Sequence, residues 1–172
     1  MTAGQVVVRQ LTPADWAVSR QVRLTALAEA PYAFMSTLAR EQAFDELAWQ
    51  QRLASPAAAT FLAWVGDEPA GTATSKIDDP GDEFAVPGAW QLVGMWVDPK
   101  ARGTGVAGTL VEAVAGHAAG QGAHALVLWV TEVNDRAMAF YRRLGFALTG
   151  ARQPVRPDEP DHLELQMVRP LP

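Results

Sequence analysis

The strand–turn–helix segment around residues 97–108 constrains the fold of this chain more than any other feature. An apolar stretch from Trp90 to Val97 leads into the turn RGTGVA at residues 102–107, and apolar residues at helical spacing follow. Glycines let successive backbone N–H groups point into one concave space, and a helix N-terminus adds unpaired N–H groups and a positive dipole end. The turn therefore predicts a binding site for a phosphate or pyrophosphate.

Two other phosphate-binding motifs fit this turn badly. A P-loop requires a glycine, four residues and then Gly-Lys-Ser/Thr, and the sequence contains no such run. A dinucleotide-binding fold requires Gly-x-Gly-x-x-Gly within a βαβ unit near an acidic residue. Here the spacing is Arg-Gly-x-Gly-x-Ala, and the strand before it follows two others instead of opening the chain.

Composition excludes several classes of protein. The 172 residues are about one domain's worth, and 49% of them are apolar, enough for a sizeable core. There is no cysteine, which excludes disulfides and thiolate catalysis, and the net charge of −5 argues against nucleic acid as a partner. No apolar run approaches the ~20 residues of a membrane span. Residues 1–5 lack the pattern of a signal peptide, so we expect a cytoplasmic protein. The histidines lack metal-ligand spacing, so no metal is expected.

Periodicity and turn residues predict an α/β chain in the order β-α-α-β-β-β-α-β-α-β-β, without repeats or a second domain. The expected strands are 5–11, 60–65, 70–77, 90–97, 123–130, 146–150 and 163–168. The expected helices run from Thr12 to about Pro31, over 45–53, from 106 to about Gly120 and from Asn134 to Leu144. The proline-rich residues 154–160 are expected to form a loop.

A second motif, NDRAMAFYRRLGF at residues 134–146, completes a recognisable pair. With RGTGVA at 102–107, it resembles the signatures of the GNAT superfamily of acyl-CoA-dependent N-acyltransferases, Gln/Arg-x-x-Gly-x-Gly/Ala and Asn-x-x-Ala-x-x-Phe-Tyr-x-x-x-Gly-Phe. The resemblance covers roughly Val6 to Val168. It implies a mixed sheet with splayed fourth and fifth strands, in a single domain over 1–172 with its core at about 6–168.

The function implied by this resemblance is transfer of an acetyl group from acetyl-CoA to a primary amine, by direct attack in a ternary complex. Two alternatives stay open: acetylation of a peptide or protein at its N-terminus or at lysine, and an acyl-CoA-binding module with little catalysis. The implied partners are a small-molecule amine or peptide, with no nucleic acid and no membrane. A homodimer is allowed.

The resemblance also implies a set of donor-binding residues. The turn would hold the pyrophosphate of CoA with its N–H groups, Arg102 would add a charge-assisted contact, and the fourth strand would hydrogen-bond the pantetheine arm. Asn134 would contact the same arm, cap its helix, or do both. The full expected set is Met95, Trp96, Val97, Arg102, Gly103, Thr104, Gly105, Val106, Ala107, Gly108, Asn134, Arg136, Phe140 and Tyr141.

Two groups are candidates for the chemistry of acyl transfer. Gly94 lies within an apolar strand, where glycine often marks a bulge, although close packing against a neighbour would also account for it. A bulge there would turn the Met95 backbone N–H toward the thioester carbonyl. Tyr141 is the candidate acid for the departing thiolate, because a phenol with a pKa of ~10 can protonate a thiolate whose conjugate acid has a pKa of ~8.5. The alternative is that Tyr141 only packs beside Phe140.

The general base is undetermined from the sequence. Some members of the superfamily carry a glutamate on the fourth strand, where this chain has Gln91, which can only position the amine or a water. Other candidate bases are Glu41, Asp82, Glu83 and Glu164. The acidic loop with Asp78, Asp79, Asp82 and Glu83 could steer a cationic amine or simply be solvated. The aromatic candidates for the acceptor site are Tyr32, Phe34, Trp49, Phe84, Trp90, Trp96 and Trp129.

Overall fold

A single seven-stranded sheet, in the order β1-β2-β3-β4-β5-β7-β6, forms the centre of the computed structural model, which describes residues 5–172. The strands are β1 Val6–Gln10, β2 Ala58–Val65, β3 Glu68–Ile77, β4 Ala89–Val97, β5 Ala125–Thr131, β6 Ala147–Pro154 and β7 Leu163–Pro170. The α-helices are α1 Trp16–Glu29, α2 Leu38–Gln42, α3 Glu46–Ala54, α4 Val106–Gly120 and α5 Asp135–Arg143. The expectation that the chain begins without a signal-peptide pattern rests on residues 1–5, and residues 1–4 lie outside the described part of the chain.

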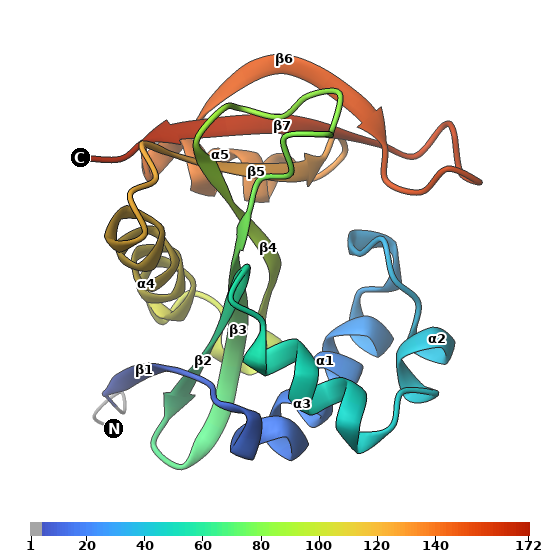
Figure 1. Ribbon diagram of the computed structural model, residues 1–172, viewed down its shortest axis with the longest axis vertical. Coiled ribbons are helices and arrows are strands. Elements are labelled where there is room, and N and C mark those ends of the chain that lie inside the picture. Colours follow the sequence, from blue (N-terminus) through green and yellow to red (C-terminus); the bar gives the residue numbers. More distant parts are fainter. Residues whose placement is uncertain (1–4) are drawn as a thin grey trace.

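The sheet opens in its middle, between β4 and β5. These strands are parallel, whereas the other neighbours are antiparallel, and they pair only where Ala89–Gln91 faces Ala125–Val127. Beyond Gln91 the strands diverge, which separates an N-terminal arm, β1–β4, from a C-terminal arm of β5, β7 and β6 (Figure 1). The mixed α/β architecture and the splay of the fourth and fifth strands are thus confirmed.

Helices cover both faces of the N-terminal arm. The buried stripe of α4, with Val106, Leu110, Val111 and Val114, packs on one face in a core that also takes in Met138 and Tyr141 of α5. Helix α1 lies on the opposite face (Figure 1), with its buried residues against Leu62 and Trp96. Across residues 5–172, no helix combines the length and the apolar composition that a bilayer crossing needs.

A β-bulge interrupts β4 at Gly94. Thr74 of β3 pairs with Val93 and Thr72 pairs with Trp96, so β4 carries one more residue than β3 over this stretch. Gly94 has a φ of +61°, a conformation that residues with a Cβ rarely adopt. The predicted bulge is therefore present, and it lies where β4 has already lost β5 as a partner.

Three differences from the predicted elements have local causes. The short helix α2 was not expected, because its five residues are too few to show a periodicity. Strand β6 continues to Pro154 instead of ending at Gly150, because Gly150, with a φ of +95°, lies in a register shift within the strand. The first helix begins as a 3-10 turn at Pro13–Asp15, in which Asp15 accepts a hydrogen bond from the Thr12 N–H.

Candidate active site

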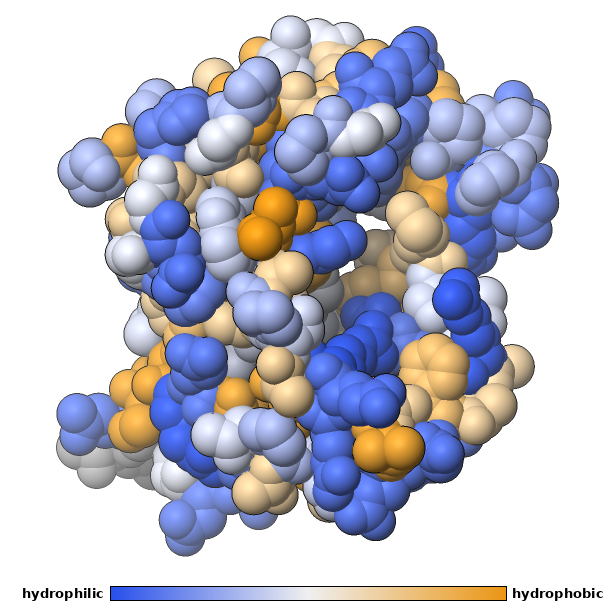
Figure 2. Space-filling view, viewed as in Figure 1, coloured by the Kyte–Doolittle hydropathy of each residue, from blue (hydrophilic) through white to orange (hydrophobic). Residues whose placement is uncertain are grey.

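A cleft of about 1310 Å³ follows the opening of the sheet, and Figure 2 shows the surface hollowed at this level. Both arms, the glycine turn, α5 and the segment between α1 and α2 contribute to its walls. The predicted site residues that line it are Gln91, Met95, Trp96, Val97, Arg102, Gly103, Gly105, Ala107, Gly108, Asn134, Arg136, Phe140 and Tyr141. Thr104 and Val106 do not line it: the Thr104 hydroxyl donates back to Ala101 O, and Val106, the first residue of α4, is buried in the core against the sheet.

The glycine turn is an open cradle of backbone donors. Gly103 and Gly105 have φ angles of +83° and +93°, and a Cβ built on either would meet no other atom within 4 Å. The first hydrogen bond of α4 runs from Thr109 N to Gly105 O, so the N–H groups of residues 106–108 have no partner in the helix. These donors and the empty space beside them fit a pyrophosphate group.

Arg102 is held at the edge of this cradle by other residues. Its Nη2 is 2.8 Å from Glu29 Oε2, and its Nε donates to Val97 O at 3.1 Å. The same Glu29 oxygen accepts a hydrogen bond of 2.9 Å from Trp96 Nε1. A phosphate that engages Nη2 would therefore have to replace Glu29, a residue that neither sequence motif contains.

Tyr141 and Asn134 reach the cleft from α5. Tyr141 is 8% exposed, it packs against Phe140 and Phe146, and burial raises the pKa of its hydroxyl well above the ordinary value of 10.0. The phenol consequently keeps its proton at neutral pH and can act as a donor. Asn134 Oδ1 accepts from Ala137 N at 3.0 Å, so the residue caps α5 while it lines the cleft.

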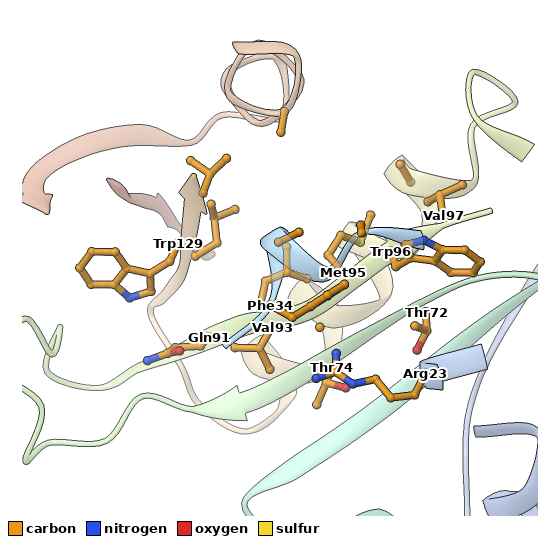
Figure 3. A pocket seen from close by; sticks show the side chains of 18 of the residues that line it. Arg23, Phe34, Thr72, Thr74, Gln91, Val93, Met95, Trp96, Val97 and Trp129 are labelled. Carbon is orange, nitrogen blue, oxygen red and sulfur yellow. The ribbon is translucent and has the colours of Figure 1, made fainter. Parts of the chain in front are cut away.

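Gln91 is fixed by a carboxylate behind it. Its Nε2 donates to Oδ1 of Asp78, whose other oxygen accepts from Val86 N at 2.7 Å. Because the amide nitrogen is turned to Asp78, the carbonyl oxygen is left on the cleft side of the side chain (Figure 3). Asp78 is 5% exposed, so it is not a solvated loop residue, and its hydrogen bond positions Gln91.

The four candidate bases differ in whether they line the cleft. Glu164 of β7 is half-buried in the cleft wall; burial raises the pKa of its carboxyl group, and a 2.9 Å hydrogen bond from Gln153 only partly offsets that effect. Asp82 lines the same cleft, and Glu83 lines an adjoining pocket. Glu41, in contrast, is fully buried between Arg23 and Arg52.

The carboxylate of Glu41 forms ion pairs with two arginines. Arg23 Nη2 lies 2.8 Å from it and Arg52 Nη1 lies 2.9 Å from it. Burial acts to raise the pKa of Glu41, but the hydrogen bonds from Arg23 and Arg52 outweigh it and lower the pKa from 4.5 to about 2. Such a carboxylate is a weak base, so its role is structural.

We expect Glu41→Gln to lower the free energy of unfolding by about 3 kcal/mol at pH 7, because it leaves two guanidinium groups without their buried partner. The depressed pKa means that this contribution is complete above about 4.5 and is lost as pH falls toward 2. Urea unfolding at several pH values measures both effects. Glu46→Gln, at the exposed start of α3, is the control and should change stability by less than about 0.5 kcal/mol. A difference between Glu41→Gln and wild type that stays constant down to pH 2.5 would contradict the assignment.

The aromatic candidates for the acceptor side are divided between cleft and core. Tyr32, Phe34, Trp49, Trp96 and Trp129 line the cleft, and Phe84 lines the adjoining pocket, where it packs on Trp129 with ring centroids 5.8 Å apart. Trp90 packs in the core against His117 and is not part of the site.

An opened parallel strand pair, a bulge at its mouth and a cradle of helix N–H groups are the features expected of an acyl-CoA-dependent N-acyltransferase. The chain belongs to the acetyltransferase (GNAT) family, whose model matches residues 22–146. It is 34% identical over 86 residues to the mycothiol acetyltransferase of Geodermatophilus obscurus; these are 50% of this chain but 28% of that relative, so the chain matches only a part of its length.

Solved structures share the whole fold at low identity. YncA of Salmonella typhimurium, solved with its cofactor acetyl-CoA, is 20% identical to this chain. The superposition covers 98% of this chain and 95% of YncA, with a TM-score of 0.74. A GNAT-family acetyltransferase of Streptococcus pneumoniae is 18% identical, with coverage of 98% and 100% and a TM-score of 0.75. The predicted family is thus confirmed, and with it the acetyltransferase class that the family model describes.

Proposed function

We propose that the protein transfers the acetyl group of acetyl-CoA directly to a primary amine bound in the same cleft. The observation that carries this proposal is the meeting of three features in one cavity: the glycine cradle, the unpaired edge of β4 at its bulge, and the polar wall with Gln91 and Glu164. Acetyl-CoA supplies the activated thioester, and the chain binds, orients and moves protons around it.

On the donor side, backbone groups do most of the work. The N–H groups of residues 106–108 hold the pyrophosphate, and the free edge of β4 at Trp96 and Val97 hydrogen-bonds the pantetheine arm as an added strand would. The Met95 N–H, beside the bulge, donates to the carbonyl oxygen as negative charge develops on it. Asn134, Arg136 and Phe140 border the arm from the side of α5.

On the acceptor side, Glu164 accepts the proton of the amine and Gln91 positions it. The amine nitrogen forms a bond to the carbonyl carbon, the carbon–sulfur bond breaks, and Tyr141 donates a hydrogen bond or proton to the leaving sulfur. Some other members of the superfamily carry a glutamate at the position of Gln91. In this chain Glu164 serves as the base instead. The raised pKa of Glu164 brings its basicity closer to neutral pH, which is where a general base is most effective.

We expect Glu164→Gln to lower kcat/KM for the amine by about 10²-fold at pH 7. The base works in its ionised form, so wild-type activity should rise with pH through the elevated pKa of Glu164, and this rise should vanish in the variant. A pH profile of kcat/KM makes the measurement. Glu132→Gln is the matched control, because Glu132 pairs with Arg152 outside the cleft. If the rise of kcat/KM with pH is the same in Glu164→Gln as in the wild-type protein, another group is the base.

The decisive test of the proposed function is release of free thiol from acetyl-CoA with a panel of amino acids, amines, polyamines and short peptides. Turnover with a small amine supports the proposal, whereas turnover confined to peptides favours peptide N-terminal or lysine acetylation. Binding of acetyl-CoA without turnover on any member would favour an acyl-CoA-binding module.

A further inference from the structure

Arg23 of α1 directs one side of its guanidinium group at the bulge of β4. Its Nε donates to both oxygens of Glu41 at 3.2 and 3.0 Å, and its Nη2 donates to Oε1 at 2.8 Å. The group is 17% exposed and lies over the ring of Phe34, 4.7 Å from its centroid. It is therefore held rigidly from two sides.

Nη1 is the part of Arg23 that these contacts leave available. It lies 3.7 Å from the position that a Cβ would occupy on Gly94, and the Thr74 hydroxyl lies 3.9 Å from the same point. Figure 3 shows the two side chains together below β4. Among residues 5–172 no hydrogen bond from Nη1 is found, so two N–H groups face the cleft immediately beside the proposed reaction centre.

Charge on this side of the cleft is out of balance. Arg23 and Arg52 share the single carboxylate of Glu41, which leaves one net positive charge; the Arg23 side chain is 17% exposed and that of Arg52 is 44% exposed. Lys76, on the same face of β3 as Thr74, also lines the cleft. A forked guanidinium in such surroundings recognises carboxylates particularly well.

Carboxylates also line this cavity, together with Arg136 and Arg143 of α5. Glu164 of the C-terminal arm and Asp82 of the loop before β4 face the same cavity. A molecule bound in the cleft would thus find a cation beside the bulge and a carboxylate, Glu164, on the C-terminal arm. This arrangement matches an acceptor that carries both charges.

We infer that the acceptor is a free α-amino acid, whose carboxylate binds Nη1 of Arg23 while its amine lies between Met95 and Glu164. Only one carbon separates amine and carboxylate in such a molecule, so an anion at Gly94 brings the amine to the adjacent residue. The Thr74 hydroxyl is a second donor for the carboxylate. A peptide N-terminus has a neutral amide at this position and leaves the excess charge of Arg23 uncompensated. This inference rests on the proposed function and names its substrate class.

The test compares leucine, methionine and phenylalanine with the amide and the decarboxylated amine of each, by thiol release from acetyl-CoA. We expect kcat/KM for the acid to exceed that of the amide by about 10- to 100-fold, as for hydrogen bonds to a charged group. Arg23→Gln should remove this preference. Arg9→Gln, which removes a guanidinium group from an ion pair with Asp15 outside the cleft, is the control and should retain it. If Arg23→Gln does not fold, Arg23→Lys, which keeps a positive charge beside Glu41, is tested in its place.

Equal use of acid, amide and amine by the wild-type protein would overturn the inference, as would a loss in Arg23→Gln that is the same for all three. If no amine in the panel is acetylated, the proposed function fails and the inference is judged by binding alone. Calorimetric titration of the CoA-loaded protein with the acid and with its amide then decides. Preferential binding of the acid that is lost in Arg23→Gln supports the carboxylate site, and equal binding refutes it.

Discussion

Replacing Gly105 with glutamate is expected to weaken the binding of CoA by about 100-fold or more. The residue caps α4 at a φ of +93°, at the cradle formed by the N–H groups of residues 106–108. A side chain there meets open space, so the variant has no packing clash, but its carboxylate occupies the volume and opposes the charge of the pyrophosphate. Loss of two charge-assisted hydrogen bonds accounts for this magnitude.

Two further variants separate the causes. Gly105→Ala imposes the strained φ without the charge and should weaken CoA binding much less. Gly66→Glu makes the same substitution at a φ of +61° in the turn between β2 and β3, where space is also open, and reports the stability cost alone. Calorimetric titration with CoA is the measurement. Wild-type affinity in a folded Gly105→Glu protein would show that the pyrophosphate binds elsewhere.

Tyr141→Phe is expected to lower kcat by about 10²-fold, at the lower end of the range for general acids. The effect should be modest because a thiolate is a fair leaving group and because burial, which raises the pKa of Tyr141, makes complete proton transfer less favourable than hydrogen bonding. The phenyl ring keeps its packing against Phe140 and Phe146, so folding should be unaffected.

Steady-state kinetics on the best acceptor, with circular dichroism as the folding check, distinguish three roles for Tyr141. A loss in kcat with little change in the KM for acetyl-CoA supports a role in thiolate departure. A loss confined to KM would assign the hydroxyl to donor binding. A change of less than about twofold in both would assign Tyr141 to packing.

The local structure of the proposed donor half could be predicted because its signals are local. The glycine turn, the start of α4 and the cap at Asn134 each depend on residues within one turn of chain. The bulge at Gly94 was also predictable, because a glycine inside an apolar strand weakens the strand and commonly marks a bulge. Gly150 misled the prediction because a bulge within β6 and the end of a strand give the same local pattern.

The acceptor half could not be predicted, because its residues meet only through the fold. Arg23 and Glu41 are 18 residues apart on different helices, and the amide of Gln91 is oriented by an aspartate on the far side of a loop. Nothing in the sequence beside Arg23 distinguishes it from an arginine on the surface of a helix. Separating Glu164 from Glu41 as a base likewise required knowing which carboxylate is paired.

The short pairing of β4 with β5 gives this sheet two edges that face inward. A sheet edge usually lies at the rim, where its unpaired N–H and C=O groups invite other chains and have to be guarded. Here the edges of β4 beyond Gln91 and of β5 beyond Val127 face one another across the cleft. They are too far apart to pair and are screened by the two arms from a second protein's strand. The pantetheine arm in the proposed donor site is a thin, extended molecule with amide groups of its own, so it is suited to satisfy the unpaired groups of such inward edges.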